Sequence, residues 1–176
     1  MIMISVMDIP KGEQHTHARA LLRECLKKAN IDFSEDCLAF GEHGKPYLRD
    51  FPDVHFNLTH SNGIAACMVS DCECGIDAEA VRKFPEKVIR RVCSEKEKQT
   101  LESLPESERD MYFFRLWTLK EAYVKMLGRG ISYPMSTAEF SINDGISTNI
   151  EGCTFSQYIL KGGRFVVSVC RRTVDR

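Results

Sequence analysis

The sequence predicts an α+β protein built from two similar-sized halves, residues 1–85 and 86–176, within a single domain. Segments typical of strands and helices follow one another in the order strand, helix, strands, and then helix, strands. A chain of 176 residues is long enough for one sizeable core or for two small halves packed closely together. Hydrophobic residues make up 43% of the chain and charged residues 28%, which is ordinary for a globular protein.

The first half begins with a strand and a helix and continues with a hairpin. Residues 1–7 alternate weakly between apolar and polar side chains, which favours a strand. Apolar residues recur at three- and four-residue spacing over residues 15–29, which favours a helix. Residues 54–58 and 64–70 are typical of strands, and the Asn62-Gly63 pair between them is a strong signal for a tight turn.

The second half begins with two helices and ends in strands. Ser94 followed by Glu97 has the spacing of a capping box, so a helix is expected to begin at this serine. After an interrupting proline, a longer helix is expected over residues 107–127. Residues 137–142 favour a strand, and residues 155–170 favour an antiparallel hairpin around a Lys-Gly-Gly turn.

Charge and cysteine usage narrow the class of protein. The 24 basic and 25 acidic residues give a formal net charge of −1, which does not favour binding to nucleic acid or to a membrane. The N-terminal apolar run is too short for a transmembrane helix and lacks the basic start of a signal peptide. Eight cysteines without a framework spacing indicate reduced thiols in a cytoplasmic protein, and Cys72 and Cys74 have no second pair with which to complete a zinc site.

A cluster of charges occupies one side of the long predicted helix. At about 100° per residue, Trp117, Lys120, Glu121 and Lys125 fall within an arc of roughly 140°. Glu121 and Lys125 form an i,i+4 pair, and such a pair is most often part of a solvated face. The tryptophan among the charges and the Gly-Arg-Gly sequence that ends the helix favour a functional site instead.

Two carboxylates stand together on a short alternating segment, residues 75–81. On a strand, Asp77 and Glu79 point to one face, while Ile76 and Ala78 point to the other. Neighbouring carboxylates repel each other unless a cation lies between them. Mg²⁺ suits such a pair, since it is commonly bound by one or two carboxylates and by phosphate groups of a substrate. The alternative, two solvated acids at the end of a strand, is equally open from this segment alone.

Five short sequences in a fixed order resemble the 4′-phosphopantetheinyl transferases. These sequences are GKPYL, HFNLTHS, GIDAE, SEKE and WTLKEAYVKMLGRGI, which lie between residues 44 and 131, and the resemblance as a whole runs from about residue 18 to residue 131. The resemblance is to the surfactin-synthetase-activating type, in which a single chain contains two similar α/β halves related by a pseudo-two-fold axis, and it favours a monomer. It implies Mg²⁺-dependent transfer of the 4′-phosphopantetheine arm of coenzyme A to a serine of an apo acyl or peptidyl carrier protein, with release of adenosine 3′,5′-bisphosphate.

The same resemblance implies roles for particular residues. Asp77, Glu79 and Glu121 would bind Mg²⁺. Glu121 would take the proton of the carrier serine, and Lys125 would stabilise and protonate the departing bisphosphate. The residues implied to bind coenzyme A are Arg19, Lys45, Thr59, His60, Lys120 and Lys125. Trp117 is expected to pack between the two halves.

Two other functions stay open from the sequence. One is a metal-dependent enzyme that acts on phosphate esters with the same acids but without a carrier protein. The other is a catalytically silent domain that still binds a carrier or coenzyme A. Asp77, Glu79, Glu121 and Lys125 are all present, which disfavours the silent domain, because a degenerate copy is expected to have lost at least one of them.

Overall fold

The computed structural model describes residues 1–6 and 12–173 and has the predicted α+β fold. The main elements of the first half are β1 (Ile2–Val6), α1 (Gln14–Lys28), β4 (His55–Ser61) and β5 (Ile64–Ser70). Those of the second half are β6 (Cys74–Ala80), α4 (Glu106–Leu127), β9 (Cys153–Leu160) and β10 (Phe165–Arg172). The shorter elements are β2 (Leu38–Phe40), β3 (Pro46–Leu48), α2 (Ile89–Val92), α3 (Glu95–Ser103), β7 (Phe140–Ser141) and β8 (Ser147–Thr148).

The two halves have the same strand topology. The first contains an antiparallel sheet in the order β1-β5-β4, and the second contains one in the order β6-β10-β9. In each half, the strand that precedes the long helix (β1 or β6) pairs with the last strand (β5 or β10). The last strand also pairs with the strand just before it in sequence (β4 or β9). This repetition is what two halves related by a pseudo-two-fold axis require. The sheets divide the chain between β5 and β6, which is earlier than the approximate division expected at residue 85.

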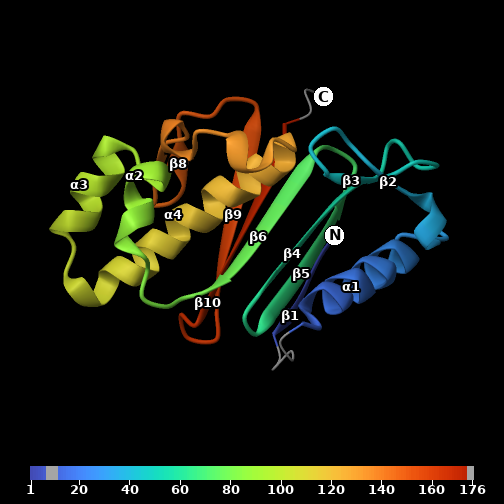
Figure 1. The fold of residues 1–176 in the computed structure, drawn as a ribbon, viewed down its shortest axis with the longest axis horizontal. Coiled ribbons are helices and arrows are strands. Elements are labelled where there is room, and N and C mark those ends of the chain that lie inside the picture. The colour runs from blue at the N-terminus through green and yellow to red at the C-terminus, as the bar shows by residue number, and fades with distance from the viewer. Residues whose placement is uncertain (7–11, 174–176) are drawn as a thin grey trace.

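The elements form four layers, with a helix on each outer face and the two sheets between them (Figure 1). Helix α1 covers the first sheet through buried residues such as Leu22 and Leu26. The inner faces of the sheets pack together through side chains such as Ile64 from β5 and Ile76 from β6. Helix α4 covers the outer face of the second sheet, so its charged residues lie near β6.

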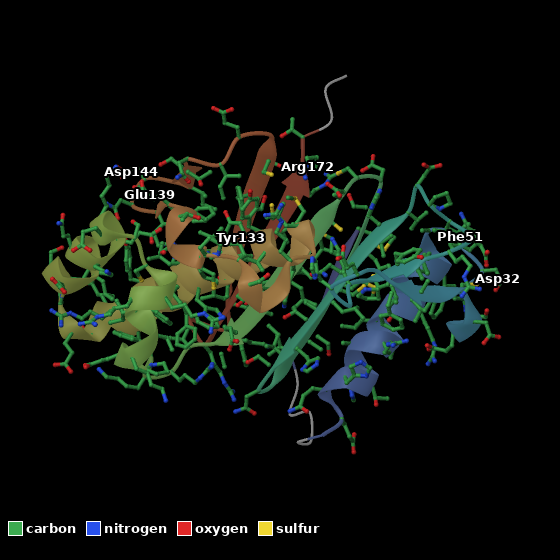
Figure 2. All side chains as sticks on the ribbon, turned by 45° about the horizontal axis from the view of Figure 1, so that its top comes forward. Asp32, Phe51, Tyr133, Glu139, Asp144 and Arg172 are labelled. Atoms are coloured by element: carbon green, nitrogen blue, oxygen red, sulfur yellow. The ribbon has the colours of Figure 1, made fainter. Side chains whose placement is uncertain are left out.

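The molecule is elongated because the halves lie beside each other. Asp32 and Phe51 lie at the end formed by the first half, and Glu139 and Asp144 lie at the opposite end (Figure 2). No helix in the described part of the chain is both long enough and apolar enough to cross a membrane.

Most predicted local features are confirmed. Gly63 has a φ of 80° in the β4–β5 turn, a conformation that a glycine adopts without strain. The capping box is present, since the Ser94 side chain accepts from the Glu97 N–H and the Glu97 side chain accepts from the Ser94 N–H. The strand predicted over residues 137–142 is wrong in extent, because a 3₁₀ turn occupies Met135–Thr137 and only Phe140–Ser141 pairs with β8.

The predicted location of Trp117 is also wrong. Its ring lies 5.9 Å from that of Phe113, centroid to centroid, and packs on the core of the second half. The tryptophan therefore contributes to the core that anchors α4 and not to the contact between the sheets.

Candidate active site

The site lies where the edges of the two sheets meet. Strands β4 and β6 are both edge strands, and they run beside each other without pairing through their backbones. Instead, the Ile76 N–H donates to Asn57 Oδ1 at 2.9 Å, and the Ala78 N–H donates to Thr59 Oγ1 at 3.3 Å. Side chains of β4 thus satisfy backbone groups of β6 that an open edge would leave exposed. The line along which β4 and β6 meet is called the seam below.

Both carboxylates of β6 face the seam. Asp77 is buried, and its Oδ1 accepts from the Thr59 hydroxyl at 3.1 Å and from Lys125 Nζ at 2.6 Å. Glu79 Oε2 accepts from the Ser61 hydroxyl at 2.8 Å and from Arg82 at 2.7 Å. The alternation predicted for β6 is confirmed, since Ile76 points away from the carboxylates into the core between the sheets.

Gly75 allows α4 to approach β6 closely. A Cβ atom at this position would lie 2.0 Å from the carbonyl oxygen of Ala122 and 2.6 Å from the nitrogen of Met126. Only glycine fits between the strand and the helix at this separation. The close approach brings Glu121 and Lys125, one helical turn apart, to the seam.

Glu121 lies within electrostatic reach of the other charged groups. Burial raises the pKa of the Glu121 carboxyl, and the negative charges of Asp77 and Glu79 raise it further, while Lys125 and Arg91 oppose the shift. Three acidic side chains and one lysine are therefore concentrated at one place. This is the cluster that the helical arc and the strand alternation predict separately.

The donor atoms of the acidic cluster suit a divalent cation, although in the described part of the chain their arrangement is not that of a formed metal site. Among the described residues, no group of three or more His, Cys, Asp and Glu side chains is arranged so that it could hold a metal ion as it stands. The chemistry of the donors nevertheless suits Mg²⁺, which prefers carboxylate oxygens. Moreover, Oδ2 of Asp77 is buried without a hydrogen-bond partner, an unusual condition for a carboxylate. A cation held by Asp77 would satisfy this oxygen.

The first half supplies Thr59 and His60 beside Lys125. The Thr59 Oγ1 accepts from Lys125 Nζ at 3.1 Å, so this threonine contacts both the lysine and Asp77. His60 is exposed and lies edge-on to His15. Partial burial lowers the pKa of His60, and the nearby positive charges of His15 and Lys125 lower it further. The imidazole is thus biased toward its neutral form, which both donates and accepts hydrogen bonds.

Lys45 joins the β2–β3 hairpin to the end of α4. Its Nζ donates to the carbonyl oxygen of Met126 at 2.7 Å and to that of Cys74 at 3.3 Å. A cation at this position interacts favourably with the negative end of the helix dipole. Lys45 therefore holds the hairpin beside the site.

Two adjoining pockets lie next to Lys45. One, of about 190 Å³, extends toward the seam and is lined in part by Asn57 and Lys125. The other, of about 470 Å³, is lined in part by Arg49 and His55. The sequence alone did not indicate Arg49 or His55 as site residues. Arg49 lies outside the five family motifs, and His55 begins HFNLTHS but was given no role; the folding of the hairpin beside β4 brings both to one pocket.

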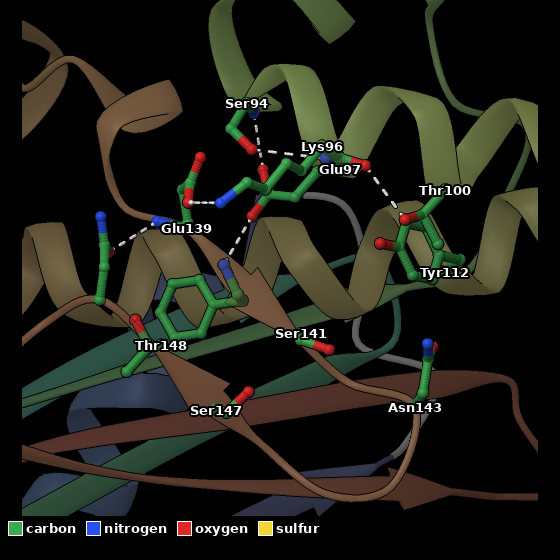
Figure 3. Close-up of a pocket in the computed structure, with 12 residues that line it drawn as sticks. Ser94, Lys96, Glu97, Thr100, Tyr112, Glu139, Ser141, Asn143, Ser147 and Thr148 are labelled. Carbon is green, nitrogen blue, oxygen red and sulfur yellow. Dashed lines mark hydrogen bonds and ion pairs between the residues drawn. The ribbon is translucent and has the colours of Figure 1, made fainter.

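The cofactor-binding role predicted for Lys120 is contradicted by its burial. Its side chain is fully buried, and Nζ donates to Glu97 Oε2 at 2.6 Å and to the carbonyl oxygen of Met135 at 3.1 Å. Glu97 also accepts from the Phe140 N–H at 2.8 Å. The pair therefore ties α3 and α4 to the segment before β7. Figure 3 shows Glu97 beside a polar pocket of about 410 Å³ that Ser94, Thr100 and Ser147 help to line.

Arg19, also predicted to bind the cofactor, is engaged elsewhere. Its guanidinium pairs with Glu35, to which Arg23 also donates. Glu35 belongs to the 3₁₀ turn that follows α1 (Glu35–Cys37). The structure thus places Arg19 in a network that fixes the turn against α1.

Fold and site together define an enzyme-like α+β protein with two repeated halves and an acidic, lysine-containing cluster at their seam. The model of the 4′-phosphopantetheinyl transferase superfamily matches residues 73–170. This match covers more than half of the 176 residues, and the chain belongs to that superfamily.

Individual relatives agree with this assignment. The 4′-phosphopantetheinyl transferase psf-1 of Bacillus pumilus is 42% identical over 108 residues, which are 60% of this chain and 46% of that protein. The transferase Sfp of Bacillus subtilis strain 168 is 32% identical over 126 residues, 72% of this chain and 54% of that protein. The transferase ffp of B. subtilis is 30% identical over 156 residues, 85% of this chain and 67% of that protein. The chain thus spans about half the length of psf-1 and Sfp.

One solved structure that is similar to this chain is the holo-[acyl-carrier-protein] synthase of Thermotoga maritima. It has a TM-score of 0.49 and 24% sequence identity, and the match covers 60% of this chain and 65% of that one.

Proposed function

We propose that the protein transfers the 4′-phosphopantetheine arm of coenzyme A to a serine of an apo carrier protein. The observation that carries this proposal is the meeting of Asp77, Glu79, Glu121 and Lys125 at the seam. Membership of the superfamily and the activities named for psf-1, Sfp and ffp support it.

In the proposed reaction, the serine Oγ forms a bond to the phosphorus that carries the pantetheine arm, and the bond from this phosphorus to the oxygen of adenosine 3′,5′-bisphosphate breaks. Glu121 takes the serine proton as a general base, and α4 carries it to the seam one helical turn from Lys125. Lys125 Nζ donates to the phosphate oxygens and returns a proton to the departing bisphosphate.

Asp77, Glu79 and Glu121 would hold Mg²⁺, which neutralises charge on the pyrophosphate when it is bound. The lysine and the acids are mutually dependent. Lys125 donates to the same Asp77 that would bind the cation, so a shift in one group alters the position of the other.

The pockets beside Lys45 are proposed to receive coenzyme A. The larger one falls within the usual range for small-molecule sites, and Lys45, Arg49 and His55 offer hydrogen-bond donors to phosphate groups. His60, next to Lys125, would contact the same ligand from β4.

The test is intact-protein mass spectrometry of apo carrier proteins incubated with this protein, coenzyme A and Mg²⁺. The expected result is a gain of one phosphopantetheine mass that EDTA abolishes and that Lys125→Met, shown to be folded by circular dichroism, does not produce. Release of adenosine 3′,5′-bisphosphate without any carrier would favour the alternative, an enzyme that acts on phosphate esters. If no carrier gains mass and no bisphosphate is released, both functions are refuted.

A further inference from the structure

Three side chains of β4 contact β6 in an alternating pattern. Asn57, Thr59 and Ser61 are two residues apart, so all three point toward β6 from one side of the strand. Asn57 and Thr59 accept from backbone N–H groups of β6, and Ser61 donates to Glu79. Strand β4 therefore contributes a row of polar groups that sets the position of β6 relative to the first half.

Ser61 lies at the end of this row, next to the turn. It is the last residue of β4 and pairs with Ile64, the first residue of β5, across the tight turn. Its hydroxyl is 2.8 Å from Glu79 Oε2, and it is half-buried. A hydroxyl fixed in this way restricts the rotation of the carboxylate that it contacts.

The second donor to Glu79 comes from the same half of the chain. Arg82 donates to the same oxygen at 2.7 Å, but 55% of its side chain is exposed, compared with 17% for that of Glu79. An exposed ion pair contributes little to the orientation of its partner, because water competes for both groups. Arg82 also donates to the Ala80 oxygen at 2.8 Å and lies over the Phe114 ring, so it holds its partner within the second half. Ser61 is the contact that ties Glu79 to β4.

We propose that Ser61 is a positioning residue, which directs Glu79 toward the seam so that this carboxylate acts together with Asp77 on a divalent cation. Thr59 acts on Asp77 in the corresponding way, since it donates to Oδ1 and leaves Oδ2 free of hydrogen bonds. This inference rests on the proposed function, in which Glu79 is a ligand to Mg²⁺. Hydrogen bonds to ligating carboxylates commonly change metal affinity by about 10–100-fold.

The experiment is a titration with Mn²⁺, a paramagnetic substitute for Mg²⁺, in which the loss of the free-ion signal in electron paramagnetic resonance reports binding. It is run with and without coenzyme A, and no carrier is present. Ser61→Ala is expected to weaken Mn²⁺ binding about 10-fold, whereas Ser61→Thr, which keeps the hydroxyl, is expected to restore it to within about 2-fold of wild type.

Ser70→Ala is the matched control. This serine lies at the far end of the same hairpin, and its hydroxyl contacts Asp71 and Cys72 instead of the site. It is expected to leave the Mn²⁺ affinity unchanged. Urea unfolding of each variant checks that the fold is retained.

Two results would overturn the inference, and they differ in what they say of the function. If Glu79→Gln weakens Mn²⁺ binding but Ser61→Ala does not, Ser61 has no positioning role and the metal ligands stand. If the wild-type protein binds no Mn²⁺ with or without coenzyme A, the metal part of the proposed function is wrong, and the role of Ser61 is wrong with it.

Discussion

Replacing Gly75 with alanine is expected to separate α4 from β6. The added Cβ would lie 2.0 Å from the Ala122 oxygen, and Cβ atoms essentially never approach another heavy atom within 3.0 Å. The helix and strand must therefore move apart by at least about 1 Å at this point. The two nearest atoms, the Ala122 oxygen and the Met126 nitrogen, belong to the backbone, so no side-chain rotation relieves the contact.

The cost follows from two opposing effects. Overpacking of a core typically destabilises a protein by about 1–3 kcal/mol, and the upper end is expected here because backbone must shift. Alanine recovers about 0.4–1 kcal/mol by restricting the unfolded chain. The net loss of about 2 kcal/mol corresponds to a fall in Tm of about 4–8 °C for a protein of this size.

Gly41→Ala provides the matched control. Gly41 does not need a positive φ, and its added Cβ would contact only the Lys45 oxygen, at an ordinary distance of 3.6 Å. This variant is expected to be neutral or more stable by about 0.4–1 kcal/mol. Scanning calorimetry of both variants measures the difference. A Gly75→Ala protein as stable as Gly41→Ala would refute the close approach of α4 to β6.

A second measurement examines the site directly. Because Glu121 and Lys125 are carried by α4, a shift of about 1 Å is expected to lower kcat/KM for the proposed carrier modification about 100-fold. A Gly75→Ala protein that is destabilised but fully active at low temperature would mean that the site does not depend on this packing.

Two further perturbations concern buried charges. Lys120→Met is expected to destabilise the protein by about 3–5 kcal/mol in urea unfolding, because it leaves Glu97 charged and buried, whereas Lys120→Met combined with Glu97→Gln, which removes the charge and keeps an oxygen acceptor, should recover part of the loss; equal losses would refute this role of the pair. The raised pKa of Glu121, caused by burial and by Asp77 and Glu79, means that the ionised carboxylate opposes folding above that pKa. Glu121→Gln is therefore expected to raise the urea midpoint at about pH 7 in EDTA, and this gain should vanish below the ordinary pKa of glutamate; a gain that persists in acid would contradict the reasoning.

The parts of the site that the sequence predicts depend on local periodicity. Alternation along residues 75–81 is enough to place Asp77 and Glu79 on one face, because it requires only that the segment is a strand. Helical spacing is likewise enough to group Glu121 with Lys125. Neither pattern predicts that the Asp77–Glu79 pair on the strand faces the Glu121–Lys125 pair on the helix. In the sequence, that step comes from the family resemblance alone.

The same local patterns fail where a distant partner decides the outcome. Lys120 shares a helical arc with Glu121, yet about 100° separates them, so one faces β6 and the other faces α3 and Glu97. The capping box accounts for the contacts of Glu97 with its own helix. It gives no sign that the carboxylate also binds Lys120 and the Phe140 N–H.

The polar row on β4 was missed for a related reason. The sequence predicts a strand that ends at residue 58, so only Asn57 lies on it, and Thr59 and Ser61 are expected in the connecting turn. Strand β4 continues to Ser61, and the meeting of two sheet edges gives all three side chains a partner on β6. Had β4 and β6 paired through their backbones, a continuous sheet would have left no place for side chains between them. Because the halves meet through side chains, hydroxyls come from the first half, acids from β6, and Glu121 with Lys125 from α4. The site is therefore a property of the junction, and neither half contains it alone.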